Sequence, residues 1–564
     1  MEKFADIIYQ RPDMADFKAA VKAFVDAFPK AADYETARAL FLELCGKNDR
    51  FNTMNTVAYI RNTMNTADEF YEKEMEFWGQ AMPEAELELK AANALILASP
   101  FLEDFKKEYG ELYFHNLENR MRFANEANLK NQVRESQLTQ QYAKASAVCT
   151  TTFHGEEVNF YGLLKYMQST DRSLRKEAFE AWSALYASVS GELDAIYDEL
   201  IKVRCDMARV LGFKDYIEMA YQDRERYEYG RRDVENFRRQ ILTEIVPVCQ
   251  TLFEQQRQRL GVEKLHFYDE ALVFAEGNAI PEGTTEEMVQ KAQQMYHELS
   301  KETGEFFDYM VEHGLFDLET KPGKRQGGYC TFLTDEKAPF IFSNFNKTSA
   351  DVDVLTHEAG HAFEAYTASR IHPLAGQVWS TSEIDEIHSM SMEFFTYPWM
   401  GLFFGENADK YRYAHLVSAL TVIPYMACVD EFQHRVFEEM AVDAKSRRGI
   451  WRELEKKYMP WRDYDGNEFL EGGGFWMQKQ HIFLFPFYYI DYALAQMGAF
   501  ELYGRMKSDP AAAWEDYYRL CCAGGSKGYF ELLKIANLSS PFADGTVKKV
   551  MDSIRDELTR GIRL

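Results

Sequence analysis

The sequence is poor in cysteine, and its cysteines are scattered. Eight occur in 564 residues, only Cys521 and Cys522 are neighbours, and no Cys-x-x-Cys pair is present. Thiolate zinc sites are built from such pairs, and disulfide frameworks need many cysteines in a small chain. We therefore expect neither kind of site, and the thiols fit the reducing cytoplasm.

Long hydrophobic runs are missing as well. The longest uncharged run, residues 413–429, is short for a bilayer and contains His415 and Pro424. Residues 1–20 carry acidic side chains where a secretion signal has a basic start and an unbroken apolar stretch. We expect residues 413–429 to form a buried helix with a break, and the protein to be cytoplasmic with no membrane partner.

Positive charge is in short supply. The chain has 64 Lys and Arg against 90 Asp and Glu, which gives a formal net charge of −26. Nucleic acid or an anionic membrane would have to approach against this field. The charge balance therefore excludes both as the main partner, while 46% hydrophobic residues are typical of a globular protein.

Few residues interrupt helices: the chain has 15 prolines and 32 glycines. Apolar residues recur at intervals of three and four, as in residues 162–212, which predicts an all-α fold with a core-facing helix there. An exposed scaffold helix is the alternative for that segment. We divide the chain into an N-terminal helical part, residues 1–200, and a catalytic part, residues 201–564, with a single compact unit as the alternative.

Two segments break the helical pattern. Residues 327–346 are aromatic and β-branched with turn residues in their middle, which predicts a strand pair. Residues 465–496 contain a triple glycine at 472–474 and then an aromatic run around His481. This second pattern predicts a mobile glycine loop that leads into a buried helix.

Two histidines and a glutamate fall within five residues in the stretch DVLTHEAGHAFEAY, at His357, Glu358 and His361. On a helix the two histidines lie one turn apart on one face and reach a single ion, while the glutamate reaches a water bound to that ion. Catalytic zinc takes three protein ligands and leaves a fourth position for water. The alternative is an ordinary helix that contains the motif by chance.

The surroundings of the motif favour the metal site. Thr348 or Ser349 is placed to cap the helix, with Asp351 in position for a capping box. Gly360 lies in the helix interior, where glycine costs about 1 kcal/mol relative to alanine. We expect another backbone or a substrate to come close to Gly360.

Residues 379–399 predict a second helix that begins near Ser380 or Ser382. Glu386 and Glu393 lie two turns apart on one face of it, so both carboxylates can point at the first helix. We expect Glu386 to be the third metal ligand and Glu393 to accept a hydrogen bond from a ligand histidine. Two imidazoles and a carboxylate suit one Zn²⁺ per chain, and cobalt or manganese can use the same ligands.

With these residues in place, the sequence resembles the zinc oligopeptidases of the oligoendopeptidase F and thimet oligopeptidase group, and within it the bacterial Pz-peptidase type. The resemblance rests on HEAGHAF, followed 25 residues after His361 by Glu386 in EIHSMSMEF. It runs from about residue 150 to the C-terminus, and the first 110 residues match only in being helical. The further matching segments are PFIFSNFN, HIFLFPFYYIDYALAQ, STDRSLRKEAFEAW and CCAGGSKGYFELL.

The resemblance implies a prolate, predominantly helical oligopeptidase of the zincin type, with a small β element near the active site and a deep central channel. It implies a metalloendopeptidase that hydrolyses internal peptide bonds of short unfolded peptides. Zinc would be held by His357, His361 and Glu386, and Glu358 would be the general base.

The resemblance also implies that a histidine and tyrosines beyond the glycine loop donate to the oxyanion. We expect Tyr492 to be the donor, His481 to support it and Tyr489 to hold substrate. A shift of one residue in this segment would bring in Tyr488 instead. The glycines at 472–474 suggest a loop that closes over bound peptide. An aromatic stripe that only packs in the core is the alternative.

Other functions stay open. A zinc carboxypeptidase or dipeptidyl carboxypeptidase of related helical fold would use a dedicated Arg or Lys to hold the substrate carboxylate, and a helical peptide-binding scaffold would carry a vestigial motif. Residues 327–334 and 340–344 suggest a strand edge to which a peptide adds in extended form. Residues 524–527, Gly-Gly-Ser-Lys, lack the Gly-Lys-Ser/Thr order of a phosphate loop, so we expect no nucleotide binding.

Overall fold

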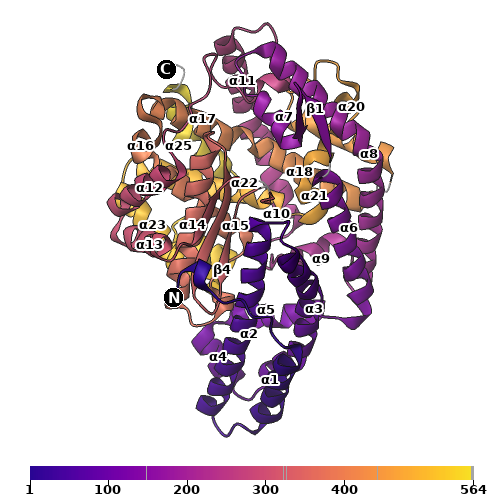
Figure 1. The fold of residues 1–564 in the computed structure, drawn as a ribbon, viewed down its shortest axis with the longest axis vertical. Helices are drawn as coiled ribbons and strands as arrows, with labels where there is room; N and C mark the ends of the chain where they lie inside the picture. The colour runs from indigo at the N-terminus through magenta and orange to yellow at the C-terminus, as the bar shows by residue number, and fades with distance from the viewer. Residues whose placement is uncertain (148, 322, 326, 441–442, 561–564) are drawn as a thin grey trace. The chain divides into compact units, whose positions relative to one another are not determined.

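A computed structural model describes residues 1–147, 149–321, 323–325, 327–440 and 443–560 (Figure 1). Helices dominate, and the strands form two small sheets, so the predicted helical class is confirmed. The chain divides into two compact units, each built from three separate segments. The first unit contains Met1–Glu126, Ile280–Glu406 and Glu501–Ser539, and the second contains Ala127–Ala279, Asn407–Phe500 and Ser540–Leu564.

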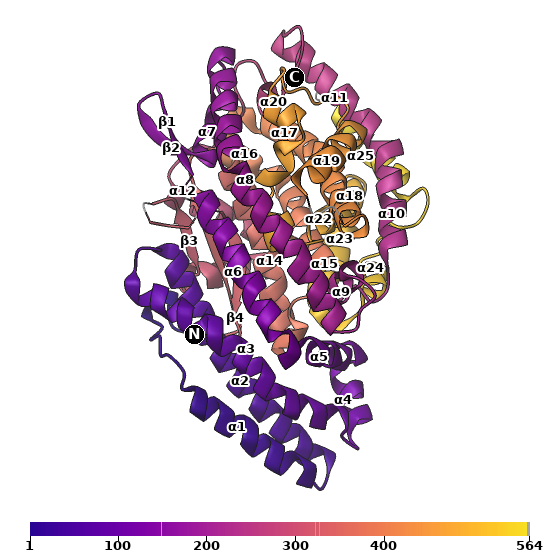
Figure 2. The same cartoon turned by 90° about the vertical axis from the view of Figure 1, so that its right-hand side faces the viewer.

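The first unit begins with five helices: α1 (Met14–Ala27), α2 (Tyr34–Met64), α3 (Glu69–Leu97), α4 (Leu102–Tyr109) and α5 (Glu111–Phe123). Helices α1 and α2 both pack along α3 (Figure 2). Large aromatic side chains fill the space between them, with Phe51 edge-on to Trp78 and Phe41 edge-on to Phe105. This aromatic core holds the five helices together.

The rest of the first unit contains a three-stranded sheet and further helices. Its helices are α12 (Thr285–Leu299), α13 (Lys301–Glu312), α14 (Ala350–Ile371), α15 (Ser382–Phe395), α16 (Met400–Phe404), α23 (Pro510–Ala523) and α24 (Tyr529–Ile535). Helix α14 packs against two other helices, α15 and α23. Its own residues are mostly buried, since it also lies against the sheet.

The sheet has the strand order β3-β5-β4, with β3 (Phe316–Glu319) parallel to β5 (Ala338–Phe345) and β4 (Tyr329–Leu333) antiparallel to it. The predicted strand pair in 327–346 is therefore confirmed. Strand β3 is an addition, because four residues carry too little of an alternating pattern to be recognised. Strand β4 is an edge of this sheet, and α14 packs on β4 and β5.

The second unit is also helical. Its elements are α6 (Leu129–Ala147), β1 (Thr150–Phe153), β2 (Glu156–Asn159), α7 (Phe160–Tyr166), α8 (Arg172–Val210), α9 (Tyr216–Asp223), α10 (Arg231–Gln240), α11 (Val246–Leu260), α17 (Ala408–Thr421), α18 (Ile423–Glu438), α19 (Ala444–Tyr458), α20 (Glu468–Glu471), α21 (Gln480–Leu484), α22 (Tyr489–Met506, whose last turns lie in the first unit) and α25 (Thr546–Arg560). Helices α6 and α8 run side by side (Figure 2).

Helix α8 confirms the core-facing helix expected within 162–212, because one face of its 39 residues is buried along its length. The hairpin of β1 and β2 before it was not expected. The expected division of the chain near residue 200 falls inside α8, whereas the compact units combine distant segments. The two-part division stays a prediction about function.

The uncharged run 413–429 is a buried helical segment with a break, as expected. Helix α17 ends at Thr421, and α18 starts at Ile423 with Pro424 in its first turn, where proline is tolerated. By length and composition, 382–438 is the one stretch among the described residues that would pass for a membrane span, and 67% of its most apolar window is buried. Such burial is typical of core helices.

The glycines at 472–474 have a different role from the one expected. Gly473 has φ of 89°, and a Cβ there would lie 2.1 Å from the carbonyl oxygen of Arg448. A Cβ on Gly474 would lie 2.4 Å from the Phe469 ring. Both glycines are buried. They allow close packing of the backbone, and the expected mobile loop is not what the packing shows.

Candidate active site

Helix α14 forms as predicted, but its N-terminus is held differently. Ser349 is the N-cap residue, yet its side chain makes no capping hydrogen bond, so the predicted cap is wrong. Instead the Asp351 carboxylate accepts from the backbone N–H groups of Asn346 and Lys347, at 2.9 and 2.7 Å. The carboxylate therefore ties the loop after β5 to the first turn of the helix, where negative charge is also favoured.

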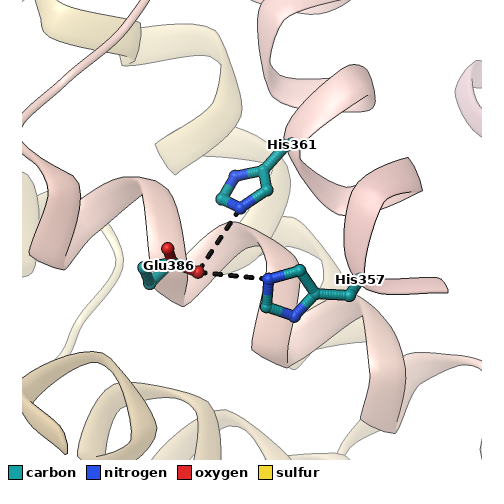
Figure 3. Close-up of side chains that lie close together, drawn as sticks. All are labelled: His357, His361 and Glu386. Atoms are coloured by element: carbon teal, nitrogen blue, oxygen red, sulfur yellow. Dashed lines mark ion pairs between the residues drawn. The ribbon is translucent and has the colours of Figure 1, made fainter. Parts of the chain in front are cut away.

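The three predicted metal ligands meet at one point (Figure 3). Nε2 of His357 lies 3.2 Å and Nε2 of His361 3.4 Å from Oε2 of Glu386. The histidines stand one turn apart on α14, and the glutamate comes from α15, which packs along it. One ligand atom from each of the three residues lies within 4.8 Å of the others.

This donor set fits zinc. Two imidazole nitrogens and a carboxylate oxygen are a ligand set of catalytic zinc, which keeps a fourth position for water. The histidines converge through Nε2, and that leaves Nδ1 of His357 for a supporting contact. Nδ1 lies 2.6 Å from Oε1 of Glu393, seven residues after Glu386. Such a carboxylate fixes the tautomer and orientation of a ligand histidine.

The ligand histidines and Glu386 shift one another's pKa toward their charged forms. Burial alone would raise the pKa of Glu386, but His361 and His357 outweigh that effect and hold the pKa well below its ordinary value. Burial would lower the pKa of His357, and hydrogen bonding to Glu386 and Glu393 instead raises it well above the ordinary value. A positive charge between these side chains is therefore strongly stabilised, as a bound cation would be.

Glu358 stands beside the ligands without joining them. Its side chain is 8% exposed, and burial, the largest cause, raises its pKa. A carboxylate with a raised pKa is better suited to accept and release protons than one with an ordinary pKa. Gly328, the residue directly before edge strand β4, is its neighbour: a Cβ there would lie 3.7 Å from Oε1 of Glu358.

Gly360 confirms the expected close approach of another backbone. A Cβ on it would lie 2.6 Å from the carbonyl oxygen of His388 and 2.6 Å from Cα of Ser389. Any larger residue would push α15 away from α14. The distance between the histidines and Glu386 therefore depends on this glycine.

A second polar cluster lies on the same pair of helices and was not anticipated. Glu364, Asp385 and His388 bring ligand-type atoms within 4.8 Å of one another, and Nδ1 of His388 lies 3.0 Å from Oε2 of Glu364. Burial raises the pKa of both carboxyl groups well above their ordinary values and lowers that of His388 to about 4. The only signal in the sequence is that each member lies within three residues of a metal ligand.

The second unit gathers the other predicted site residues into one aromatic cluster. The ring of His481 lies 4.8 Å from Tyr489 and 6.0 Å from Tyr492, centroid to centroid, and 5.9 Å from Tyr488. All three tyrosines belong to or directly precede the first turn of α22.

The tyrosines differ in exposure and in partners. Tyr489 is 8% exposed, whereas Tyr488 and Tyr492 are half-buried. The guanidinium of Arg224 stacks 4.5 Å from the Tyr488 ring and donates to the fully buried Asp491 at 2.8 Å. Arg224 was missed from the sequence, because nothing near it marks a contact with a segment more than 260 residues away.

The glycines of 524–527 serve packing. A Cβ on Gly524 would lie 2.7 Å from the carbonyl oxygen of Gln377, and one on Gly525 would lie 1.9 Å from that of Trp379. Both carbonyls belong to the connection between α14 and α15. The glycines therefore allow the end of α23 to support the two helices that carry the ligands.

Comparison with known proteins identifies the family. Residues 165–552 match the model described as Peptidase family M3, and residues 4–124 match the Peptidase M3 N-terminal domain. The chain belongs to peptidase family M3. The resemblance to the oligoendopeptidase F group and the assignment to the peptidases are thereby confirmed.

Similar proteins agree with this assignment. A solved structure of Pz peptidase A with an inhibitor is 43% identical over 99% of both chains, with a TM-score of 0.95. A structure from Bacillus anthracis strain Ames described as an oligoendopeptidase F is 41% identical over 100% of both chains, with a TM-score of 0.91. The chain shares the helical fold of these two solved structures.

Curated relatives are more distant. An oligoendopeptidase F homolog of Borreliella burgdorferi is 24% identical over 387 residues, which is 66% of this chain and 63% of the relative. The match spans 59% to 64% of the length of the curated relatives.

Proposed function

We propose that this M3 peptidase is a zinc-dependent endo-oligopeptidase that hydrolyses internal peptide bonds of short unfolded peptides. The observation that carries the proposal is the convergence of His357, His361 and Glu386 beside Glu358. The family membership and the oligopeptidase names of its relatives support the same conclusion.

His357, His361 and Glu386 hold one zinc ion per chain in this proposal. Bound there, zinc would polarise the scissile carbonyl and lower the pKa of a water molecule. Glu358 takes a proton from the attacking water and delivers it to the leaving amine, which suits a buried carboxylate of raised pKa. Glu393 holds the ring of His357 in place.

The peptide adds to edge strand β4 in extended form. Gly328, directly before this strand, adjoins Glu358, so a peptide that pairs with the edge brings its backbone to the general base. Main-chain hydrogen bonds along a strand give affinity with little side-chain preference. This mode suits an enzyme that acts on mixed oligopeptides.

Tyr492 donates a hydrogen bond to the oxyanion in this proposal, and His481 supports it. The half-buried state of Tyr488 and Tyr492, together with the burial of Tyr489, favours Tyr488 as the second donor that faces substrate. Tyr489 holds substrate in this proposal, and its hydroxyl accepts a hydrogen bond from Nζ of Lys479. Tyr488 and Tyr492 are four residues apart, which is the spacing of one helical turn.

The cytoplasm is the proposed location. All eight cysteines are free thiols in the described part of the chain, which suits a reducing compartment. The substrates are then the oligopeptides present there.

The test is mass spectrometry of products from peptides of about 5 to 20 residues that are blocked at both ends. Internal cuts that a chelator abolishes are expected. Trimming that needs a free C-terminus would replace the proposal by a carboxypeptidase, and no cleavage of either set would leave a peptide-binding scaffold. For glutamate variants of the site, Glu312→Gln serves as the matched control, because it changes an exposed glutamate at the end of α13.

A further inference from the structure

We propose that Lys479 binds a carboxylate of the peptide substrate, either the free C-terminus or the side chain of an Asp or Glu. The proposal rests on the proposed function, because Lys479 belongs to the cluster of ring side chains that this function assigns to catalysis. It names a class of preferred substrate, the peptide that carries a carboxylate near the scissile bond.

The ammonium group of Lys479 is held in place. Lys479 precedes His481 by two residues, and its Nζ donates to the Tyr489 hydroxyl at 3.0 Å. Nζ also lies 4.4 Å from the centroid of the Tyr489 ring and 5.4 Å from that of Tyr425. Contacts of a cation with two aromatic rings restrict a side chain that is otherwise flexible.

The rings around the ammonium are fixed as well. Tyr425 and Tyr489 meet edge to face, with centroids 5.7 Å apart and planes at 79°. The Tyr425 hydroxyl accepts from Nε2 of Gln478 at 2.5 Å. The lysine therefore sits in a preformed aromatic cradle, and no rearrangement is needed to present its charge.

The ammonium has no acidic partner. Within the described ranges, no carboxylate oxygen lies within 4.0 Å of Nζ of Lys479, although the chain has 90 acidic residues against 64 basic ones. Elsewhere in the second unit, Lys457 pairs with Glu431 at 2.8 Å and Lys264 pairs with Asp463 at 2.5 Å. An unpaired, half-buried ammonium in an acidic protein is a natural anion site.

The ammonium also keeps donors available. It carries three N–H groups, and the Tyr489 hydroxyl accepts one of them. Carboxylates are the only anions of an ordinary peptide, and a compact ammonium donates to them as a point charge. A peptide amide or a glutamine side chain offers the same shape without the charge.

The experiment compares kcat/KM within two isosteric pairs of peptides. One pair differs only in a C-terminal acid or amide, and the other only in Glu or Gln beside the scissile bond. In the wild-type enzyme we expect at least one of the two ratios to favour the carboxylate by about tenfold, as a partly desolvated charge contact gives. The pair that responds identifies the source of the carboxylate.

Variants tie the preference to the side chain. Lys479→Met is expected to bring the responding ratio close to one, whereas Lys479→Arg keeps most of it. Lys165→Met removes an exposed lysine from α7 and should keep the wild-type ratio. The same peptides are also bound to the Glu358→Gln enzyme, with and without Lys479→Met. Their affinities give the same acid-to-amide and Glu-to-Gln comparison without turnover.

Two results would overturn the proposal. Wild-type ratios close to one in both pairs show that no carboxylate is recognised, whatever the variants do. A preference that survives in Lys479→Met places its origin elsewhere. Failure of the proposed function looks different, because no peptide is then cut in a chelator-sensitive way while the binding comparison still reports on Lys479.

Discussion

Nδ1 of His357 lies 2.6 Å from Oε1 of Glu393, while Nε2 of the same ring faces Glu386 at 3.2 Å. The ring is thus held from behind by one carboxylate as it points at the ligand position. A neutral amide in place of the Glu393 carboxylate would hold the ring less firmly and make its nitrogen less basic.

Glu393→Gln is therefore expected to weaken metal binding by about 10- to 100-fold while the fold is kept. Competition with a chromophoric chelator measures the affinity, with Glu312→Gln as the control. Unchanged metal affinity in Glu393→Gln would show that the contact plays no part in holding the metal.

Gly360→Ala is expected to separate α14 from α15. The added methyl would lie 2.6 Å from the His388 carbonyl oxygen, and overpacking of this kind costs about 1–3 kcal/mol. Gly191→Ala, in an open position of α8 where a Cβ meets nothing within 4 Å, should instead stabilise by about 0.4–1 kcal/mol.

Thermal unfolding and metal content of the two alanine variants test this pair. Loss of both stability and metal is expected for Gly360→Ala alone. If it bound metal as the wild type does, the close approach of the helices would not be what sets the ligand geometry.

Tyr492→Phe is expected to lower kcat by about 10²- to 10³-fold with little change in KM, since it removes a donor that acts in the transition state. Tyr488→Phe and Tyr489→Phe, assayed alongside, rank the neighbouring hydroxyls. We expect a larger loss for Tyr488→Phe than for Tyr489→Phe. A Tyr492→Phe enzyme with wild-type kcat would remove this tyrosine from the mechanism.

Asp430 predicts a pH dependence of stability in the second unit. It is fully buried, and Arg238 and His434 contact it. Burial alone would raise its pKa, but His434 and Arg238 lower it to about 2. Because the folded pKa lies below the unfolded value near 3.9, the carboxylate stabilises the fold above about pH 4 and loses this contribution as the pH falls toward 2.

Asp430→Asn removes the nearer of the two carboxylates that pair with Arg238, the other being Glu431 at 3.9 Å, and is expected to destabilise by about 1–3 kcal/mol at pH 7. The difference in free energy of unfolding between wild type and variant, measured by urea unfolding, should stay constant down to about pH 4 and then become smaller. A gap that widened on acidification would contradict the assigned direction of the shift.

The sequence predicted the local parts of the site well. His357 and His361 on one helix face, Glu386 and Glu393 on one face of the next helix, and the close approach at Gly360 all follow from helical periodicity, which is a short-range property. The 327–346 strand pair and the break before Pro424 were predicted for the same reason.

Other features depend on contacts between distant segments and were not predictable from pattern. Asp351 binds the preceding loop because the chain leaves β5 next to the first turn of α14. Gly473 is needed because the backbone of Arg448 packs on it. The cluster around His388 and the contact between Arg224 and Tyr488 arise only when helices meet. The compact units combine three segments each, which no local signal encodes.

In the proposed mechanism, a metal held by His357, His361 and Glu386 works with Glu358 as the general base. The most direct measurement is the metal content and the kcat/KM of Glu358→Gln on a doubly blocked peptide. We expect one metal ion per chain, as in the wild type, with kcat/KM lowered by about 10³-fold or more, because general base catalysis contributes about 10²- to 10⁴-fold. Wild-type cleavage by a metal-loaded Glu358→Gln enzyme would contradict it.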